Sequence, residues 1–263
     1  MVEYYRAVAG VLLPHLRERP LTMHRFPDGV TALGWYQYEC RGAPPWLQTI
    51  EIPYRGGAPR RFCVVDDLQS LLWVANLAAI ELHTYLGRLP ALDSPSFVVF
   101  DLDPGDPADL AQCCRVALLL REHLDGMRTW CKTSGSVGLH VYVPLNRPVT
   151  YGETKAFARD AARSLAAEYP ELAVDRNLKE LRRGKVLIDW LQNDPSRSTV
   201  APYSLRAMPW PTVSTPVTWE EVEQTARDGR AERLTFTAAA VLRRVQEHGD
   251  LFRDVLDVEQ AIP

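Results

Sequence analysis

The chain has 263 residues, of which 46% are apolar and 24% charged, so its composition is that of a folded domain and excludes a disordered segment. No apolar run approaches the roughly 18–20 residues that span a bilayer, and the first residues lack the pattern of a signal peptide. We therefore expect a cytoplasmic protein that does not enter a membrane. The net charge of −3 is low for a protein that binds nucleic acid. Basic residues still cluster locally, although such a cluster is as often only a solvated face: Arg182, Arg183, Lys185, Arg197 and Arg206.

The cysteines give no sign of a disulfide framework or of a zinc site. There are five of them, an odd number, and none shows C-x-x-C spacing. Cys113 and Cys114 lie within an apolar helical pattern, which predicts buried free thiols.

The first third of the chain predicts a mixture of helices and hairpins. Apolar residues at helical spacing indicate a helix over residues 2–17. Residues 23–39 hold two strand-like stretches around a Pro-Asp-Gly turn, which is typical of a hairpin. A strand is expected over residues 60–67, where Asp67 has the position of an N-cap for a helix over residues 68–82.

From residue 97 onward strands and helices alternate, which is typical of an α/β fold. Continuous apolar runs predict the strands, and apolar residues at helical spacing predict the helices. The expected strands cover residues 97–103, 129–134, 138–145 and 185–191, with a further candidate in 199–207. The expected helices cover residues 107–126, 151–169, 218–228 and 237–248. Since no long linker or repeat interrupts the chain, we expect its two parts to be subdomains of one unit.

Acidic side chains end two of the expected apolar strands. Asp101 and Asp103 close the strand that begins at residue 97, and alternation along a strand points both to the same side. Asp189 closes a second apolar strand. Such carboxylates repel one another unless a cation lies between them, and Mg²⁺ and Mn²⁺ prefer hard oxygen ligands. The three acids therefore predict a two-metal site for phosphoryl transfer.

Two other interpretations of these acids stay open. Asp103 precedes Pro104 and Gly105, so it could begin a turn and cap the next helix. The D-x-D pair also has some similarity to haloacid-dehalogenase phosphatases, whose first Asp is a nucleophile. In that family Gly-Thr follows the pair, and the motif opens the fold, whereas Asp101 lies deep in the chain. We rank the phosphatase well below the two-metal site.

A glycine-containing turn joins the next two strands. Its sequence is Lys-Thr-Ser-Gly-Ser-Val-Gly-Leu-His over residues 132–140. Glycines allow backbone amides to approach a phosphate, and Ser134 and His140 carry groups that can donate to phosphate oxygens. Taken alone, however, such Ser-Gly turns are mostly plain hairpins, and His140 on a strand could be a satisfied core residue. A Ser-His hydrolase is disfavoured because the chain lacks a G-x-S-x-G nucleophile elbow.

Taken in order, these motifs resemble the polymerase domain of bacterial ligase D, which is an archaeo-eukaryotic primase specialised for non-homologous end joining. The order is D-x-D, then K-T-S-G-x-x-G-x-H, then an apolar strand ending in Asp, then Y-S-L-R over residues 203–206. Similarity also covers residues 78–83 and 211–216, and it extends over almost the whole chain. The resemblance implies an α/β fold with a primase-like catalytic core similar to an RNA-recognition-motif palm, over about residues 96–263. An N-terminal β-rich subdomain would occupy about residues 1–95.

The resemblance also implies an activity and its participants. The domain would add NTPs or dNTPs to a 3′-hydroxyl at DNA breaks and gaps, using two Mn²⁺ or Mg²⁺ ions, and a DNA ligase and Ku would be partners. The metal ligands would be Asp101, Asp103 and Asp189. The nucleotide site would hold His83, Ser134, His140, Arg182, Gln192 and Arg206. The DNA end would meet His24, Arg25 and the aromatic pair Trp35 and Tyr36, whose alternative is ordinary hairpin packing.

The chain departs from the family pattern where phosphates would be bound. Val137 and His24 each stand where a lysine is common, and Tyr38 stands where a basic residue is common. A histidine is charged only near or below its pKa of about 6.5, so it is a weaker phosphate anchor than lysine. The short basic segment found before the first helix of the family is absent from this sequence. A hypothesis from a different class is a catalytically weak module that binds DNA ends and recruits a ligase, although the intact set of three acids argues against it.

Overall fold

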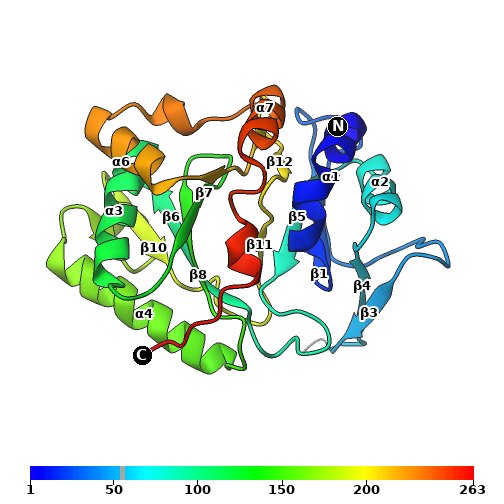
Figure 1. Cartoon of the computed structure of the whole chain (residues 1–263), viewed down its shortest axis with the longest axis horizontal. Helices are drawn as coiled ribbons and strands as arrows, with labels where there is room; N and C mark the ends of the chain where they lie inside the picture. The colour runs from blue at the N-terminus through cyan, green and yellow to red at the C-terminus, as the bar shows by residue number, and fades with distance from the viewer. Residues whose placement is uncertain (54–56) are drawn as a thin grey trace.

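Two six-stranded sheets lie side by side in the computed structural model, which describes residues 1–53 and 57–263 (Figure 1). The first sheet has the order β11-β5-β1-β4-β3, with β2 also paired to β1. The second has the order β14-β7-β8-β6-β10-β9. The strands of the first sheet are β1 Pro20–Arg25, β2 Trp35–Gln37, β3 Thr49–Ile52, β4 Arg60–Val64, β5 Ala79–Tyr85 and β11 Ser198–Val200. Those of the second are β6 Phe97–Pro104, β7 Trp130–Thr133, β8 Leu139–Pro144, β9 Ala173–Val174, β10 Val186–Asp189 and β14 Pro216–Val217.

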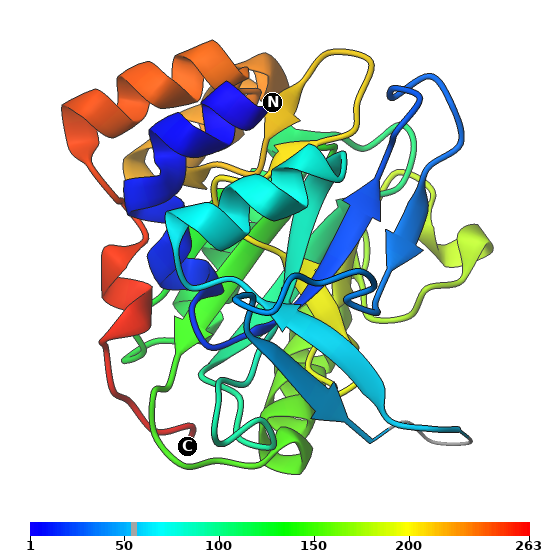
Figure 2. The same ribbon diagram turned by 90° about the vertical axis from the view of Figure 1, so that its right-hand side faces the viewer.

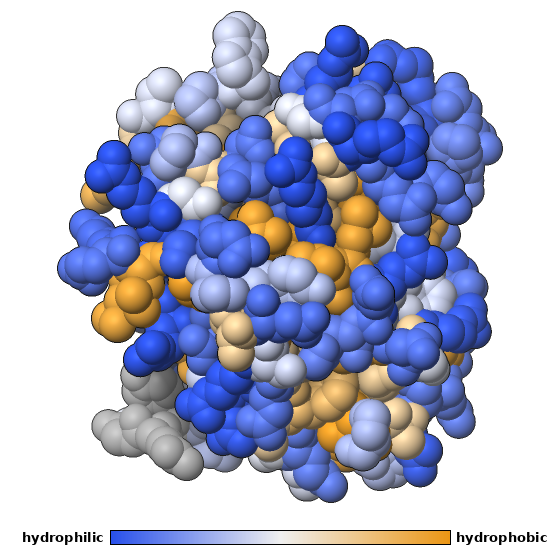
Figure 3. Space-filling model, turned by 90° about the vertical axis from the view of Figure 1, so that its left-hand side faces the viewer, coloured by the Kyte–Doolittle hydropathy of each residue, from blue (hydrophilic) through white to orange (hydrophobic). Residues whose placement is uncertain are grey.

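Helices cover the outer faces of both sheets. In Figure 1, α3 and α4 lie outside the second sheet, and in Figure 2, α1 and α2 cross a face of the first. The side of the molecule that carries α3 and α4 is mostly hydrophilic, with apolar side chains in small patches (Figure 3). No helix in the described ranges is long and apolar enough to cross a membrane. The helices are α1 Val2–Leu16, α2 Leu68–Asn76, α3 Leu110–His123, α4 Tyr151–Glu168, α5 Lys179–Arg182, α6 Trp219–Asp228 and α7 Ala238–His248.

Short polar caps fix where several of these helices begin. Asp67 accepts a hydrogen bond from the Ser70 amide at the start of α2, while the Ser70 side chain caps the Asp67 backbone in return. The same reciprocal arrangement opens α3, α4 and α6. Each cap satisfies backbone donors that the first helical turn leaves free. The expected cap at Asp67 is therefore confirmed.

Two expected helices are shorter than predicted. The helix expected over residues 68–82 ends at Asn76, and Ala78 turns the chain with a φ of 60°. Residues 79–85 then form β5, because pairing with β1 and β11 outweighs the helical propensity of the alanines. The helix expected over residues 107–126 begins only at Leu110, after the Asp109 cap.

The cysteine prediction is half wrong. Cys113 and Cys114 are buried free thiols, as expected. Cys40 and Cys63, however, form a disulfide between the loop after β2 and strand β4. The Cys40 amide also donates to the Arg61 carbonyl at 2.7 Å, which holds the loop against that strand. The pairing depends on sheet packing, so the spacing of the cysteines along the sequence could not reveal it.

The candidate strand in residues 199–207 is divided into two. Its first part, β11, joins the edge of the first sheet beside β5, although the residues around it in sequence belong to the second half of the chain. Its second part is β12 Leu205–Arg206, which pairs with β13 Thr212–Val213. Between them Tyr203 has a φ of 66°; after this bend Leu205 packs in the core of the first sheet, and Arg206 lines the pocket between the sheets.

Candidate active site

Strand β6 lies between β8 and β10, and this position brings the acids of β6 beside the acid of β10 and a histidine of β8. Asp101 is the register partner of His140 on β8 and of Asp189 on β10. Leu102 is fully buried in the core, whereas Asp101 and Asp103 face a pocket on the other side of the strand. The alternation expected from the sequence therefore places both carboxylates on one face.

The protein favours the ionised form of Asp101 but disfavours the ionised forms of Asp103 and Asp189. Burial, together with Asp101 and Asp189, raises the pKa of Asp103 to about 7. Burial also raises the pKa of Asp189. Burial would raise the pKa of Asp101 as well, but the neighbouring His140 and Lys132 lower it overall. Such opposed shifts in adjacent carboxylates are typical of functional sites.

These carboxylates have the chemistry of ligands for a divalent cation, but their side chains do not converge on a single point. Oδ1 of Asp101 is buried and has no aligned hydrogen-bond partner in the described ranges, while His140 Nε2 lies 3.2 Å away. Asp189 Oδ1 accepts the Leu191 amide at 2.9 Å, so this carboxylate is turned toward its own backbone. Among the residues that the structure describes, no three His, Cys, Asp or Glu side chains are arranged so that they could hold a metal ion together. Hard oxygen donors with an unneutralised charge nevertheless suit Mg²⁺ or Mn²⁺.

The turn between β7 and β8 is held by the Ser134 hydroxyl. Its oxygen accepts the amides of Ser136 at 3.2 Å and Gly138 at 3.0 Å. Gly135 has a φ of 73°, a conformation that favours glycine. A Cβ on Gly138 would lie 2.4 Å from the Leu102 carbonyl oxygen. Two of the amides in this turn are therefore engaged by Ser134, and Gly138 lets the turn pack directly on β6.

His140 belongs to a buried chain of polar groups. Its Nε2 faces Asp101, and its Nδ1 lies 3.2 Å from Lys132 Nζ and 3.4 Å from Thr199 Oγ1. Lys132 is fully buried and donates to Ser214 Oγ at 2.7 Å. Burial lowers the pKa of Lys132 well below its usual range and also lowers that of His140. Lys132 is not among the predicted site residues. Its position inside an apolar strand, next to the Ser-Gly turn, could have indicated that it belongs to the site.

Basic groups form the opposite side of the pocket, on the first sheet and on β12. His83 on β5 and Arg206 on β12 both line it. Both contact Glu81, which is 4% exposed: His83 Nε2 lies 2.9 Å from Oε2, and Arg206 Nε lies 3.4 Å from Oε1. Burial lowers the pKa of His83. Glu81 too is absent from the predicted residues, although it stands two positions before His83 on the same strand face.

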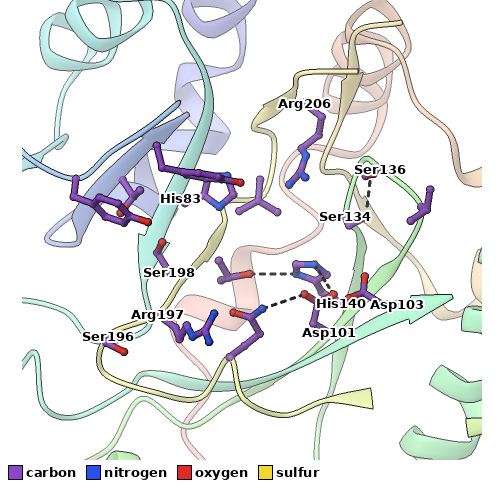
Figure 4. A pocket seen from close by; sticks show the side chains of 17 residues that line it. His83, Asp101, Asp103, Ser134, Ser136, His140, Ser196, Arg197, Ser198 and Arg206 are labelled. Carbon is purple, nitrogen blue, oxygen red and sulfur yellow. Dashed lines mark hydrogen bonds and ion pairs between the residues drawn. The ribbon is translucent and has the colours of Figure 1, made fainter. Parts of the chain in front are cut away.

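The pocket between the two sheets has a volume of about 530 Å³, which is the size of a small-molecule site. Figure 4 shows Asp101, Asp103 and His140 on one side, His83 and Arg206 across from them, and Arg197 with Ser196 and Ser198 on a third side. Seven of the predicted residues with assigned roles in metal or nucleotide binding line it: His83, Asp101, Asp103, Ser134, His140, Gln192 and Arg206. The sequence did not mark Ser136, Ser196, Ser198 or Thr199, which also line the pocket.

Two predicted residues lie beside the pocket without lining it. Asp189 is adjacent to Asp101 in the sheet. Arg182 donates to Asn177 Oδ1 at 2.8 Å, and its charge opposes the rise in the pKa of Asp103. Gln192, in contrast, reaches the pocket and donates to Asp101 Oδ2 at 3.4 Å.

Among the aromatic residues of the β1–β2 hairpin and the chain just after it, Tyr36 and Tyr38 line the pocket at its rim, whereas Trp35 does not line it and packs against Arg25. Trp35 and Tyr36 are 46% and 47% exposed, so the interpretation as hairpin core packing is not supported. The His24 ring stacks on Tyr36 at 4.1 Å between centroids, and its Nδ1 lies 3.3 Å from Glu81 Oε2. Arg25 is held by the Leu77 carbonyl at 2.6 Å and by Gln37. Tyr36 thus reaches the pocket, while His24 supports it from behind.

The two sheets and the helices outside them define a mixed α/β protein, and the pocket between the sheets has acids on one wall, arginines elsewhere and exposed aromatics at the rim. Comparison with known proteins specifies the family. The profile of the LigD primase-polymerase domain matches residues 1–252. The chain therefore belongs to the family of LigD primase-polymerase domains, as the motifs predicted.

Individual relatives agree with this assignment. The chain is 36% identical over 254 residues to the multifunctional non-homologous end joining protein LigD of Mycolicibacterium smegmatis, covering 95% of this chain and 32% of that protein. It is 30% identical over 257 residues to the bifunctional LigD of Bacillus subtilis, covering 96% of this chain and 40% of that protein. The chain thus spans about a third of the length of such relatives. A solved polymerase domain of Mycobacterium tuberculosis ligase D in complex with DNA matches with a TM-score of 0.90 and 35% identity, over 98% of this chain and 92% of that one.

Proposed function

We propose that this domain transfers a nucleoside monophosphate from an NTP or dNTP to the 3′-hydroxyl of a DNA end or gap, as a template-directed polymerase of non-homologous end joining. The observation that carries the proposal is the pocket itself, in which Asp101 and Asp103 face Arg206 across a nucleotide-sized space. A triphosphate brings negative charge that both a cation at the acids and the arginine would stabilise.

Asp101, Asp103 and Asp189 would hold two Mn²⁺ or Mg²⁺ ions. Oδ1 of Asp101, which has no aligned hydrogen-bond partner among the described residues, and the raised pKa of Asp103 support this assignment. When bound, such ions activate the attacking hydroxyl and neutralise the charge that develops on the phosphates. Gln192 and His140 would keep the Asp101 carboxylate oriented, since both lie within 3.4 Å of it.

The remaining side chains would bind and orient the substrates. Arg206 and Arg197 are the cations that line the pocket, and they would hold the triphosphate. Arg197 supplies a charge in a pocket where Val137 supplies none. Ser134 would shape the turn beside the phosphates, and His83 would contact the sugar or base. Arg182 would act on Asp103 through its charge.

The exposed rim would receive the DNA end. Trp35 and Tyr36 can stack on any base because every base has a π face. Binding of DNA is supported by the relative solved in complex with DNA. His24 and Arg25 are occupied by contacts within the protein, so they would support the aromatic pair more than they bind a 5′-phosphate. A DNA ligase and Ku would be partners, since the relatives are end-joining proteins.

The proposal includes the finer architecture expected from the sequence. The second sheet with α3 and α4 would be the palm-like catalytic core, and the first sheet the N-terminal β-rich subdomain, with a boundary near residue 95. Strand β11 would then be the contribution of the core to the other subdomain. The domain would act in the cytoplasm, at the nucleoid.

A catalytically weak DNA-end binding module is the competing function, favoured by the neutral Val137 beside the expected triphosphate. Metal dependence separates the two hypotheses. We would follow extension of a labelled primer on a gapped duplex, and in parallel binding of the same DNA, with Mn²⁺, with Mg²⁺ and with EDTA. A polymerase extends only with metal, whereas a module binds DNA equally in all three conditions and extends in none. Release of phosphate from small phosphoesters without DNA would instead indicate the phosphatase.

A further inference from the structure

Glu81 is a buried carboxylate at the point where the nucleotide pocket meets the aromatic rim. It lies on β5, where it is the register partner of His24 on β1. Its side chain is 5% exposed, and an ionised carboxylate is buried at such a position only when several partners satisfy it. Glu81 does not line the pocket, so any effect on the nucleotide must pass through the residues that it contacts.

The two carboxylate oxygens divide those contacts between two sets of residues. Oε1 accepts the Ala207 amide at 3.0 Å and lies 3.4 Å from Arg206 Nε. Oε2 lies 2.9 Å from His83 Nε2 and 3.3 Å from His24 Nδ1. One oxygen therefore accepts a hydrogen bond from the residue that follows β12 and lies within ion-pair distance of Arg206. The other is hydrogen-bonded to His83 and lies within ion-pair distance of His24. The ring of Tyr36 stacks on His24 and meets His83 edge-on at 5.5 Å, so it is connected to the same carboxylate.

The charge state of the Glu81 carboxylate determines which ring nitrogen of His83 carries the hydrogen. Burial alone would raise the pKa of Glu81, but the hydrogen bond from His83 and the charge of Arg206 lower it to about 2. Since an ionised carboxylate can only accept, the His83 Nε2 that faces it carries the hydrogen. This bond fixes the ring orientation, as a carboxylate commonly does for a functional histidine.

We propose that Glu81 is a positioning residue for nucleotide binding, which through one carboxylate orients Arg206 and His83 in the pocket and supports Tyr36 at the rim through His24. This inference rests on the proposed function, because it assumes that a nucleotide occupies the pocket. It adds a residue to that function which does not itself touch the nucleotide.

The test measures binding, so that it is independent of turnover. We would titrate ATP in the presence of Mn²⁺ into the wild type, Glu81→Gln, Glu81→Asp and a matched control, Glu51→Gln, and obtain Kd by calorimetry. Glu51 is a carboxylate of the same sheet that is 61% exposed and paired to Arg61. Glu81→Gln removes the charge with little change in shape. Glu81→Asp keeps the buried charge but shortens its reach, and it decides the question if Glu81→Gln does not fold.

The expected result is a weakening of ATP binding by on the order of tenfold for Glu81→Gln, the value of a hydrogen bond to a charged group. Glu81→Asp is expected to lie between Glu81→Gln and the wild type, and Glu51→Gln to match the wild type. In an Arg206→Ala background the effect of Glu81→Gln should be clearly smaller, because part of it acts through Arg206.

Three results would overturn the inference. They are a wild-type Kd in folded Glu81→Gln or Glu81→Asp, an unchanged effect in the Arg206→Ala background, and a wild type that binds no nucleotide at all. A wild type that binds ATP but never extends a primer would remove the proposed polymerase function. In that case the ATP affinities would still decide whether Glu81 positions Arg206 and His83.

Discussion

Replacing Gly138 with alanine would put a methyl group between strands β6 and β8 at the acidic end of the pocket. Its Cβ would lie 2.4 Å from the carbonyl oxygen of Leu102 and 3.3 Å from Oδ1 of Asp103. The first contact is with backbone, which cannot rotate away. Gly138 is not one of the described glycines with a positive φ. The expected effect therefore comes from the clash and not from lost conformational freedom.

The size of the clash sets the expected magnitude. To reach a separation of 3.0–3.4 Å, the turn and β6 must move apart by roughly 0.6–1.0 Å. Overpacking of this kind typically costs about 1–3 kcal/mol of the free energy of unfolding. Because the displaced strand carries Asp101 and Asp103, a shift near 1 Å should also slow nucleotide addition by roughly 10²-fold.

Gly10→Ala is the matched control for this change. Gly10 is an exposed residue of α1, and a Cβ there would have no atom within 4 Å. Alanine in a helix interior should stabilise the protein by about 0.5–1 kcal/mol and leave primer extension unchanged. Unfolding in urea and single-nucleotide extension measure the two quantities for both variants. Wild-type stability and rate in Gly138→Ala would refute the packing argument.

Three further predictions concern buried polar groups. Asn193→Ala should lower the free energy of unfolding in urea by about 2–4 kcal/mol. The fully buried carboxamide donates to the carbonyls of Val99 and Trp190 and accepts the Val99 amide, and all three bonds would be lost. A decrease below about 0.5 kcal/mol would contradict this prediction. Lys132→Met should cost about 1–3 kcal/mol, because the buried Ser214 hydroxyl and His140 Nδ1 both lose the amine, and it should slow primer extension at least roughly tenfold. An unchanged rate would exclude a role of Lys132 in orienting His140. The pKa of Glu81 is lowered from 4.5 to about 2, so its stabilisation is present above pH 4.5 and lost as pH falls toward 2. This amounts to roughly 3 kcal/mol, and Glu81→Gln should flatten the dependence of unfolding free energy on pH over that window.

Local patterns in the sequence were sufficient for the elements that carry the acids. The apolar run before Asp101 and the alternation along it predicted a strand with both carboxylates on one face, and β6 has this form. The Ser-Gly turn and the neighbouring strands were also predicted close to their observed bounds. These features depend on periodicity within a few residues, which a single sequence contains.

Features that depend on packing between distant segments could not be predicted in this way. Glu81 and Lys132 are charged residues within strands, and only the fold shows that each is buried against partners from other elements. The helical propensity of Ala78 and Ala79 disguised β5, which forms because β1 and β11 flank it. The disulfide of Cys40 depends on the same sheet, which brings it beside Cys63.

The central claim is that the acids of β6 serve nucleotide addition to DNA. The most direct test is extension of a labelled primer on a gapped duplex with Mn²⁺ and each NTP and dNTP, for the wild type, Asp101→Ala and the control Asp254→Ala. Asp254 is a surface carboxylate with a side chain 61% exposed. We predict template-matched extension by the wild type and the control, and none by Asp101→Ala. Extension that survives Asp101→Ala, or no extension by the wild type with any metal, would contradict the claim.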